Sequence, residues 1–116
     1  MASPLEEVES LDRLVHEPAR LVILTALAAC ASADFVFLQR VTGLTNGNLS
    51  AHLTKLYEAG LVEIHKRFVD RKPNTNVSIT ARGRHAVEGH WAKLEQLRAS
   101  ARGLKPQTGK IRSTPA

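Results

Sequence analysis

Apolar residues recur every three to four positions through the first sixty residues of the chain, and the period then changes to two. The longer period predicts helices over 4–15, 18–30, 35–42 and 46–59. Pro4 and Pro18 suit first helical positions, while Asp34 and Thr45 suit N-caps. The helix over 18–30 is apolar nearly all round, which predicts that it is buried on several sides at the centre of the domain.

The two short helices are separated only by Gly43-Leu44-Thr45, a spacing typical of a helix-turn-helix. Alternation over 61–67 and 75–80 predicts two antiparallel strands joined by a polar, basic connection over 68–74. Thr80 can cap a last helix over 81–102. The fold is therefore predicted to be mainly α with a small β-hairpin, as a winged helix-turn-helix domain over 1–102. Residues 103–116 carry basic residues and prolines but no acid, which predicts a disordered basic tail.

Charge is distributed unevenly along the chain. Residues 1–54 have a net charge of −3 and residues 55–116 a net charge of +8. A basic half suits a polyanionic partner, because each Lys or Arg near a phosphate releases condensed counterions. A solvated surface that aids solubility explains the charge equally well, so the charge alone does not decide.

The helix over 46–59 has one apolar face and one face of small and amide side chains. Asn residues in that position can pair with adenine in the major groove, and an ordinary solvated face would favour Glu, Lys and Ala instead. The polar side chains that we expect to contact DNA are Asn46, Asn48, Ser50, His52, Thr54 and Lys55. His52 lies at the flank of this face, where a phosphate contact or a packing role is expected.

The predicted hairpin adds a second candidate contact with DNA. Arg71 and Lys72 lie in its connection, and Arg67 ends the first strand. Basic side chains in this position can enter a narrow minor groove, whose negative potential is enhanced. The alternative is that Arg71 pairs with Asp70 and that Lys72 only makes the turn more soluble.

The order of elements and five short segments resemble the winged-helix regulators of the MarR and ArsR superfamily. The segments are 16–21, 48–56, 58–62, 70–72 and 79–84, within a match from about Leu11 to Leu97. The resemblance is to compact members that consist of the winged helix and a C-terminal dimerisation helix. It implies that DNA is contacted by Asn46, Asn48, Ser50, His52 and Lys55, with Arg71 and Lys72 at the wing.

The last helix is long for so small a core, and an apolar stripe runs along it. Part of the stripe is expected to pack within the same chain, and the rest to form a homodimer interface. The residues in this predicted interface are Val87, Trp91, Leu94 and Leu97. The alternative is a helix folded back entirely on its own monomer.

Other chemistry is weakly supported by the sequence. Cys30 is the only cysteine and ends an apolar helix, so we expect a small core residue rather than a redox centre. The histidines show no metal-ligand spacing, and no catalytic or cofactor motif is present, so we expect neither an enzyme nor a cofactor. The acidic N-terminus and the short apolar run over 21–30 predict a cytoplasmic protein outside the membrane.

The sequence thus predicts a homodimeric transcription repressor that binds double-stranded DNA in a sequence-specific way. Two other functions stay open: a winged helix that serves as a protein-interaction module, and an RNA-binding or nonspecific DNA-coating protein. A small-molecule effector is neither indicated nor ruled out by the sequence.

Overall fold

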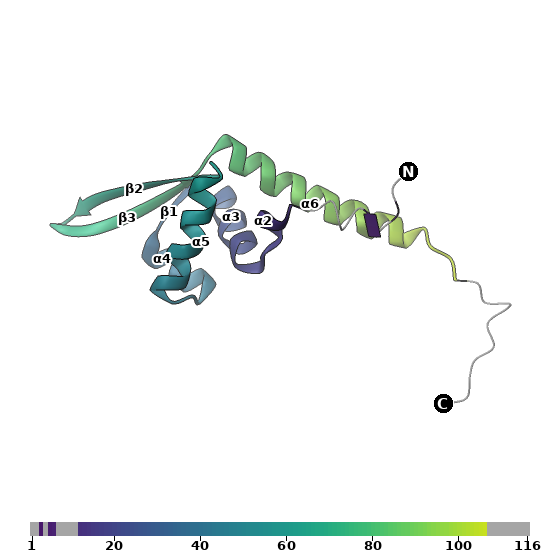
Figure 1. Cartoon of the computed structure of the whole chain (residues 1–116), viewed down its shortest axis with the longest axis horizontal. Coiled ribbons are helices and arrows are strands. Elements are labelled where there is room, and N and C mark those ends of the chain that lie inside the picture. The colour runs from purple at the N-terminus through teal and green to yellow at the C-terminus, as the bar shows by residue number, and fades with distance from the viewer. Residues whose placement is uncertain (1–2, 4, 7–11, 107–116) are drawn as a thin grey trace, which may run out of the picture.

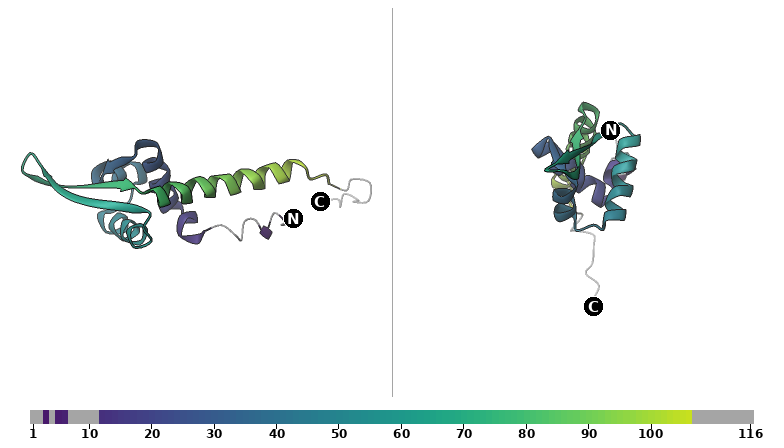
Figure 2. Two further views of the ribbon diagram at one scale, coloured as in Figure 1. Left: turned by 90° about the horizontal axis from the view of Figure 1, so that it is seen from above. Right: turned by 90° about the vertical axis from the view of Figure 1, so that its left-hand side faces the viewer.

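The computed structural model describes residues 3, 5–6 and 12–106 (Figure 1). Its elements follow one another as α2 (Arg13–His16), α3 (Pro18–Cys30), β1 (Ser32–Asp34), α4 (Phe35–Thr42), α5 (Asn46–Glu58), β2 (Val62–Val69), β3 (Lys72–Ile79) and α6 (Ala81–Arg102). The predicted winged helix-turn-helix, mainly α with a small antiparallel sheet, is confirmed. The β2–β3 hairpin and α6 extend from opposite sides of the helical core (Figures 1 and 2).

The helix boundaries follow from capping side chains that the sequence already indicated. The Asp34 carboxylate accepts a hydrogen bond from the Phe37 N–H at 2.8 Å, and the Thr80 hydroxyl accepts one from the Gly83 N–H at 2.9 Å. Thr45 caps α5 by accepting from the Asn48 N–H. Gly43 ends α4 with φ at 71°, a left-handed conformation that glycine adopts without strain.

The helix α3 packs against neighbours on most of its sides, as predicted, but the expectation for its last residue was wrong. Ile23, Leu24 and Leu27 are fully buried at the centre of the core. The opposite face remains exposed, with Val22 at 42%. Cys30 is also exposed, so it is not a core residue: Leu27 and Ala28 of the last turn pack against the core, and Cys30 lies on the exposed side at the end of the helix.

The sheet has a third strand that the sequence did not predict. β1 pairs with β3 over three residues, from Ser32 opposite Ser78 to Asp34 opposite Asn76, which gives the order β1-β3-β2. Three residues are too few to show an alternating pattern. Asp34 is also the N-cap of α4, so the sequence indicated the start of a helix at this position and gave no indication of a strand.

The wing is longer than predicted, and its turn is tighter. β2 and β3 pair as far as Val69 opposite Lys72, so the seven-residue connection was wrong. The turn consists of Asp70 and Arg71 alone, at φ values of 52° and 67°. Positive φ at both positions suits the right-handed twist of a two-residue hairpin. Pro73 lies within β3 beyond the end of β1, where its missing N–H leaves no partner unpaired.

The N-terminal helix is shorter than predicted where the structure describes it. Asp12 has an extended backbone and caps α2, its carboxylate accepting from the Leu14 N–H at 2.9 Å. A single helix over 4–15 was therefore wrong at Asp12; residues 4 and 7–11 lie outside the described residues. The same holds for 107–116, most of the predicted tail, while 104–106 are in neither a helix nor a strand.

Candidate nucleic-acid interface

The α5 helix is held on the core by one apolar face. Leu49 and Leu56 are fully buried, and Leu53 is almost fully so. Their spacing of three and four residues places them on one side of the helix. The opposite side is thereby fixed toward solvent. Exposed residues on α5 are Asn46, Gly47, Asn48, Ser50, Ala51, Thr54, Lys55, Tyr57 and Glu58. Nearly all the predicted contact residues of α5 are in this set, and His52 is the exception.

Asn46 is held by a side chain from the preceding helix. The Gln39 amide of α4 donates to Asn46 Oδ1 at 2.6 Å, across the turn of the helix-turn-helix. This contact fixes the Asn46 rotamer and leaves the Asn46 NH2 group directed elsewhere. Gln39 was not among the predicted DNA contacts. A single glutamine on α4 forms no periodic pattern that would have indicated its contact with Asn46.

His52 is only partly exposed, and the side chains of Arg20 and Glu17 lie next to its ring. Arg20 Nη1 lies 3.2 Å from His52 Nδ1, and Glu17 Oε2 lies 3.5 Å from the same atom. Burial tends to raise the pKa of Glu17, but the N–H groups of Arg20 and Ala19, with the charges of His52 and Arg20, lower it below its usual 4.5. Glu17 is therefore ionised at neutral pH beside α5.

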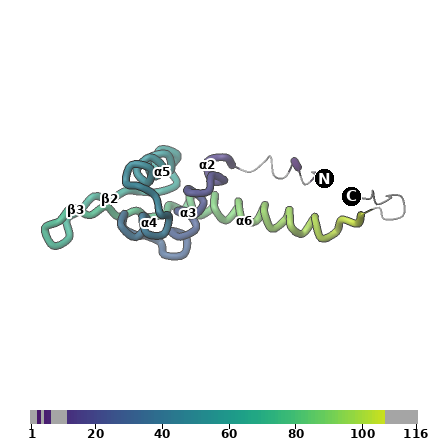
Figure 3. Tube along the Cα trace, turned by 90° about the horizontal axis from the view of Figure 1, so that it is seen from below, coloured from purple at the N-terminus to yellow at the C-terminus, as the bar shows by residue number. Residues whose placement is uncertain are grey.

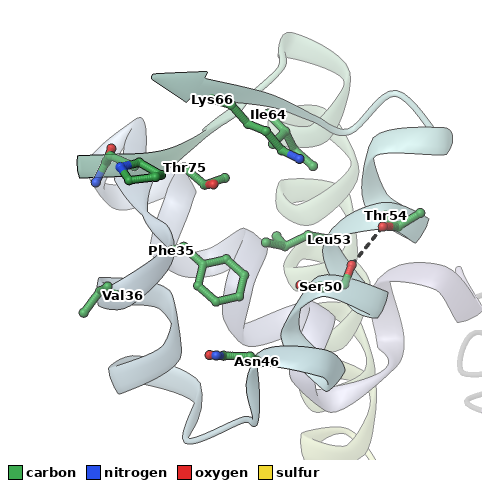
Figure 4. A pocket seen from close by; sticks show the side chains of 11 residues that line it. Phe35, Val36, Asn46, Ser50, Leu53, Thr54, Ile64, Lys66 and Thr75 are labelled. Atoms are coloured by element: carbon green, nitrogen blue, oxygen red, sulfur yellow. Dashed lines mark hydrogen bonds between the residues drawn. The ribbon is translucent and has the colours of Figure 1, made fainter. Parts of the chain in front are cut away.

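A groove of about 530 Å³ separates α5 from the wing. Figure 4 shows Leu53 and Phe35 pointing toward the middle of the groove, Asn46 at its lower end, and Ile64 and Lys66 on the strand above. Ser50 and Thr54 line the α5 side, where the Thr54 hydroxyl donates to the Ser50 carbonyl at 2.9 Å. The groove is thus apolar at its base and polar along its rim.

The wing presents different side chains on its two faces. Ile64 and Lys66 line the groove, and because side chains alternate along a strand, Phe68 follows them on that face. Phe68 is 76% exposed. Arg67 belongs to the other face and donates to Asn74 Oδ1 at 3.1 Å. Phe68 was missed in the sequence because the predicted strand ended at Arg67. Lys66 lay within that strand, in phase with Val62 and Ile64, but was not selected as a DNA contact.

The tip of the wing carries the predicted pair of basic residues. Arg71 occupies the second turn position and Lys72 begins β3, and both are exposed. Within the described residues, no ion pair joins Arg71 to Asp70. Both cations are therefore available at the end of the hairpin most distant from the core.

The predicted dimer residues of α6 fall into two groups. Val87 is 1% exposed and belongs to the core of its own chain, so it was wrongly assigned to an interface. Trp91 is 46% exposed and donates through Nε1 to Thr25 Oγ1 of α3 at 3.2 Å. Leu94 and Leu97 are half-buried. Figure 3 shows this part of α6 extending away from α4 and α5.

Residues 3, 5–6 and 12–106 contain no cluster of three or more His, Cys, Asp or Glu side chains that could hold a metal ion. Among the helices in the described part of the chain, none is long and apolar enough to cross a membrane.

The fold and the exposed polar helix define a winged helix-turn-helix protein. The family model of the winged helix DNA-binding domain matches residues 19–98, and the chain belongs to this family. An uncharacterized protein of Methanocaldococcus jannaschii is 33% identical over 85 residues, which are 73% of this chain and 92% of that protein.

Solved structures agree with this assignment. A transcriptional regulator homologue from Pyrococcus horikoshii is 32% identical with a TM-score of 0.77, and the match covers 84% of this chain and 96% of that one. A MarR-family regulator from Silicibacter pomeroyi is 21% identical with a TM-score of 0.61, over 90% and 70% of the two chains. These structures share the winged-helix fold that the resemblance to the MarR and ArsR superfamily implied. The family is that of a DNA-binding domain, and both of these solved structures are described as transcriptional regulators.

Proposed function

We propose that the protein is a homodimeric transcription repressor that recognises a specific operator, with α5 in the major groove and the wing on the adjacent backbone or minor groove. The observation that carries the proposal is the exposed amide and hydroxyl face of α5, fixed by Leu49, Leu53 and Leu56. Asn48 lies in the first turn of this face, where an amide can read a base edge.

Enrichment of bound fragments from genomic DNA, followed by binding titrations on the recovered site, tests specific recognition. Asn48→Ala should reduce discrimination between the site and unrelated DNA by about 1–3 kcal/mol, the range for one good base contact. Glu88→Ala, an exposed change on α6, is the matched control. Equal losses for both DNAs would make Asn48 a backbone contact. A protein that retards no DNA would favour the interaction-module alternative.

The wing should add affinity without specificity. Each phosphate that a cation neutralises contributes about −0.9 to the slope of log affinity against log salt. Arg71→Ala with Lys72→Ala removes two cations per protomer, so a dimer should lose between about three and four units of slope. Lys66→Gln should lose about two units, because Lys66 faces the groove beside α5. An unchanged slope would place these side chains in solvent.

Dimerisation is supported by the second half of α6. Trp91 is a large aromatic side chain left half-exposed beside the uncovered Val22 face of α3. Aromatic residues are enriched at interfaces, where they bury much area with few rotamers to fix. Two copies could place their α5 helices about 34 Å apart, the spacing of successive major-groove faces. Repression would then follow from occupation of a pseudo-palindromic operator.

A further inference from the structure

Arg20 is a buried charged side chain that connects α2, α3 and α5. The residue is 9% exposed. Its Nε donates to the Leu14 carbonyl of α2 at 2.6 Å, and its Nη1 approaches His52 Nδ1 of α5 at 3.2 Å. Glu17 Oε2 lies 3.9 Å from the same Nη1. Burial of an arginine is costly unless its donors are satisfied, and these contacts supply partners from α2, from α5 and from Glu17 between α2 and α3.

The contact with Arg20 determines which nitrogen of His52 carries a proton. A guanidinium group has five N–H donors and no acceptor. If Arg20 Nη1 donates to His52 Nδ1, the imidazole is neutral and has its hydrogen on Nε2. Without Arg20, Glu17 at 3.5 Å from Nδ1 would favour a proton on that nitrogen instead.

The proton on Nε2 is available to an outside partner. The two nitrogens lie on different edges of the ring, so contact of Nδ1 with Arg20 directs Nε2 away from the core. The His52 side chain keeps 22% of its surface exposed, and the described part of the chain offers Nε2 no hydrogen-bond acceptor. On α5, His52 lies four residues after Asn48 and three before Lys55, next to the exposed polar face.

We propose that Arg20 positions His52 so that its neutral Nε2–H donates to a phosphate of bound DNA. This inference rests on the proposed function and assigns Arg20 as a positioning residue for DNA binding. A neutral donor releases no counterions. His52 should therefore strengthen binding to every DNA sequence without changing its salt dependence, unlike Lys55, Arg71 and Lys72.

The first experiment measures the tautomer in the free full-length protein by imidazole 1H–15N correlation NMR. The expected result is a His52 ring protonated on Nε2 alone. A proton on Nδ1 would overturn the positioning by Arg20. Because no DNA is present, this result is independent of the proposed function.

The second experiment uses two substitutions that separate the inner and outer nitrogens of the ring. The amide of His52→Asn can place an oxygen near the Nδ1 position and accept from Arg20, but it has no group at the Nε2 position. His52→Gln reaches outward with an N–H donor and gives up the inner acceptor. The thermal unfolding temperature and the DNA affinity over a salt series are measured for each variant.

We expect His52→Asn to unfold like the wild type and to bind specific and nonspecific DNA about two- to twelvefold more weakly per recognition helix, at an unchanged salt slope. His52→Gln should bind more tightly than His52→Asn and unfold at a lower temperature, because Arg20 loses an acceptor. Wild-type affinity in His52→Asn, or a flatter slope, would overturn the phosphate contact.

Arg20→Lys tests the positioning role while net charge stays constant. Lysine has one ammonium nitrogen, so it cannot replace both the Nε–H bond to the Leu14 carbonyl and the Nη1 contact with His52. We expect a mixture of His52 tautomers and weaker DNA binding at an unchanged salt slope. If the tautomer and the affinity both match the wild type, Arg20 has no positioning role. A wild-type chain that binds no DNA would overturn the proposed function and the phosphate contact, and the tautomer would still decide the role of Arg20.

Discussion

The two halves of α6 are alike in sequence pattern and different in their surroundings. In residues 81–90, Gly83, Val87 and His90 are buried against the core. None of residues 91–102, all of which the structure describes, is buried, and Trp91 is 46% exposed. One apolar stripe thus serves folding at its first end and is left uncovered at its second. Helical periodicity indicates that a face is to be buried, but it does not indicate whether the same chain or a partner buries it.

The largest effect is expected in the second half, from Trp91→Ala combined with Leu94→Ala. Truncating an interface anchor typically costs about 2 kcal/mol, and a two-fold interface contains each change twice. A weakening of at least about 4 kcal/mol, roughly a thousandfold in dissociation constant, should give a monomer. Specific DNA affinity should fall more than nonspecific affinity, because only the dimer holds two helices in register.

Sedimentation equilibrium measures this change directly, with Gln96→Ala, an exposed change on the same half, as the control. If the wild type is a well-folded monomer at roughly tens of micromolar, the second half of α6 does not form a dimer before DNA binding. Retention of the dimer in the double variant would move the interface elsewhere.

In the first half, Gly83→Ala should be the most damaging single change. A Cβ at this position would overlap the Leu61 carbonyl oxygen and reach within 3.0 Å of Ile79 Cγ1. The obstacle is backbone at the start of the wing, which cannot move aside as a side chain can. A loss of about 3 kcal/mol or more in the free energy of unfolding follows, near the upper end for overpacking. Urea denaturation checks it, and an unchanged midpoint would show that α6 can shift from the wing without cost.

Features that depend on residues close together in the sequence were predicted correctly. Asp34, Thr45 and Thr80 each act as the cap that their position indicated, and the polar face of α5 follows from the spacing of its leucines. These features depend on one helix or one turn. The sequence therefore contains them within a few residues of each other.

Features that depend on distant residues were missed or misplaced. β1 exists because β3, more than forty residues later, pairs with it. The contact between Arg20 and His52 joins residues 32 positions apart, and Gly83 is needed because Leu61 approaches it closely. Val87 was predicted to be an interface residue from its place in the apolar stripe, but it packs in the core of its own chain. No local period records such approaches, since they are set by how the elements pack.

His90 makes the first half of α6 sensitive to pH. It is 3% exposed, neither ring nitrogen has a hydrogen-bond partner among the described residues, and the ring of His16 lies 5.2 Å away, centroid to centroid. Burial, and then the charge of His16, lower the pKa of His90 below its usual 6.5, while Asp12 opposes the shift and Lys93 adds to it. The unfolded chain therefore binds the proton more readily than the folded one.

Stability should be constant above pH 6.5 as far as His90 is concerned, and should fall as the pH drops below this value. His90→Leu removes this component and the two unpaired nitrogens, so the variant should lose less stability than the wild type on acidification. Urea midpoints between roughly pH 5 and 8 test the difference, the range in which histidine titrates. Parallel pH profiles for the two proteins would mean that another group is responsible.

Gly89→Ala should have the smallest effect and the opposite sign to Gly83→Ala, although the two glycines are only six residues apart. Gly89 is exposed, and a Cβ added there would meet no heavy atom within 4 Å. Alanine should then stabilise α6 by about 0.5–1 kcal/mol through helix propensity alone. At about 100° per residue, Gly89 lies away from the direction shared by Trp91, Leu94 and Leu97, so dimerisation should be unchanged. Urea denaturation of this variant measures the stability of the fold, and sedimentation equilibrium measures the dimer. A weaker dimer would place Gly89 inside the interface, so that the interface would begin in the first half of α6.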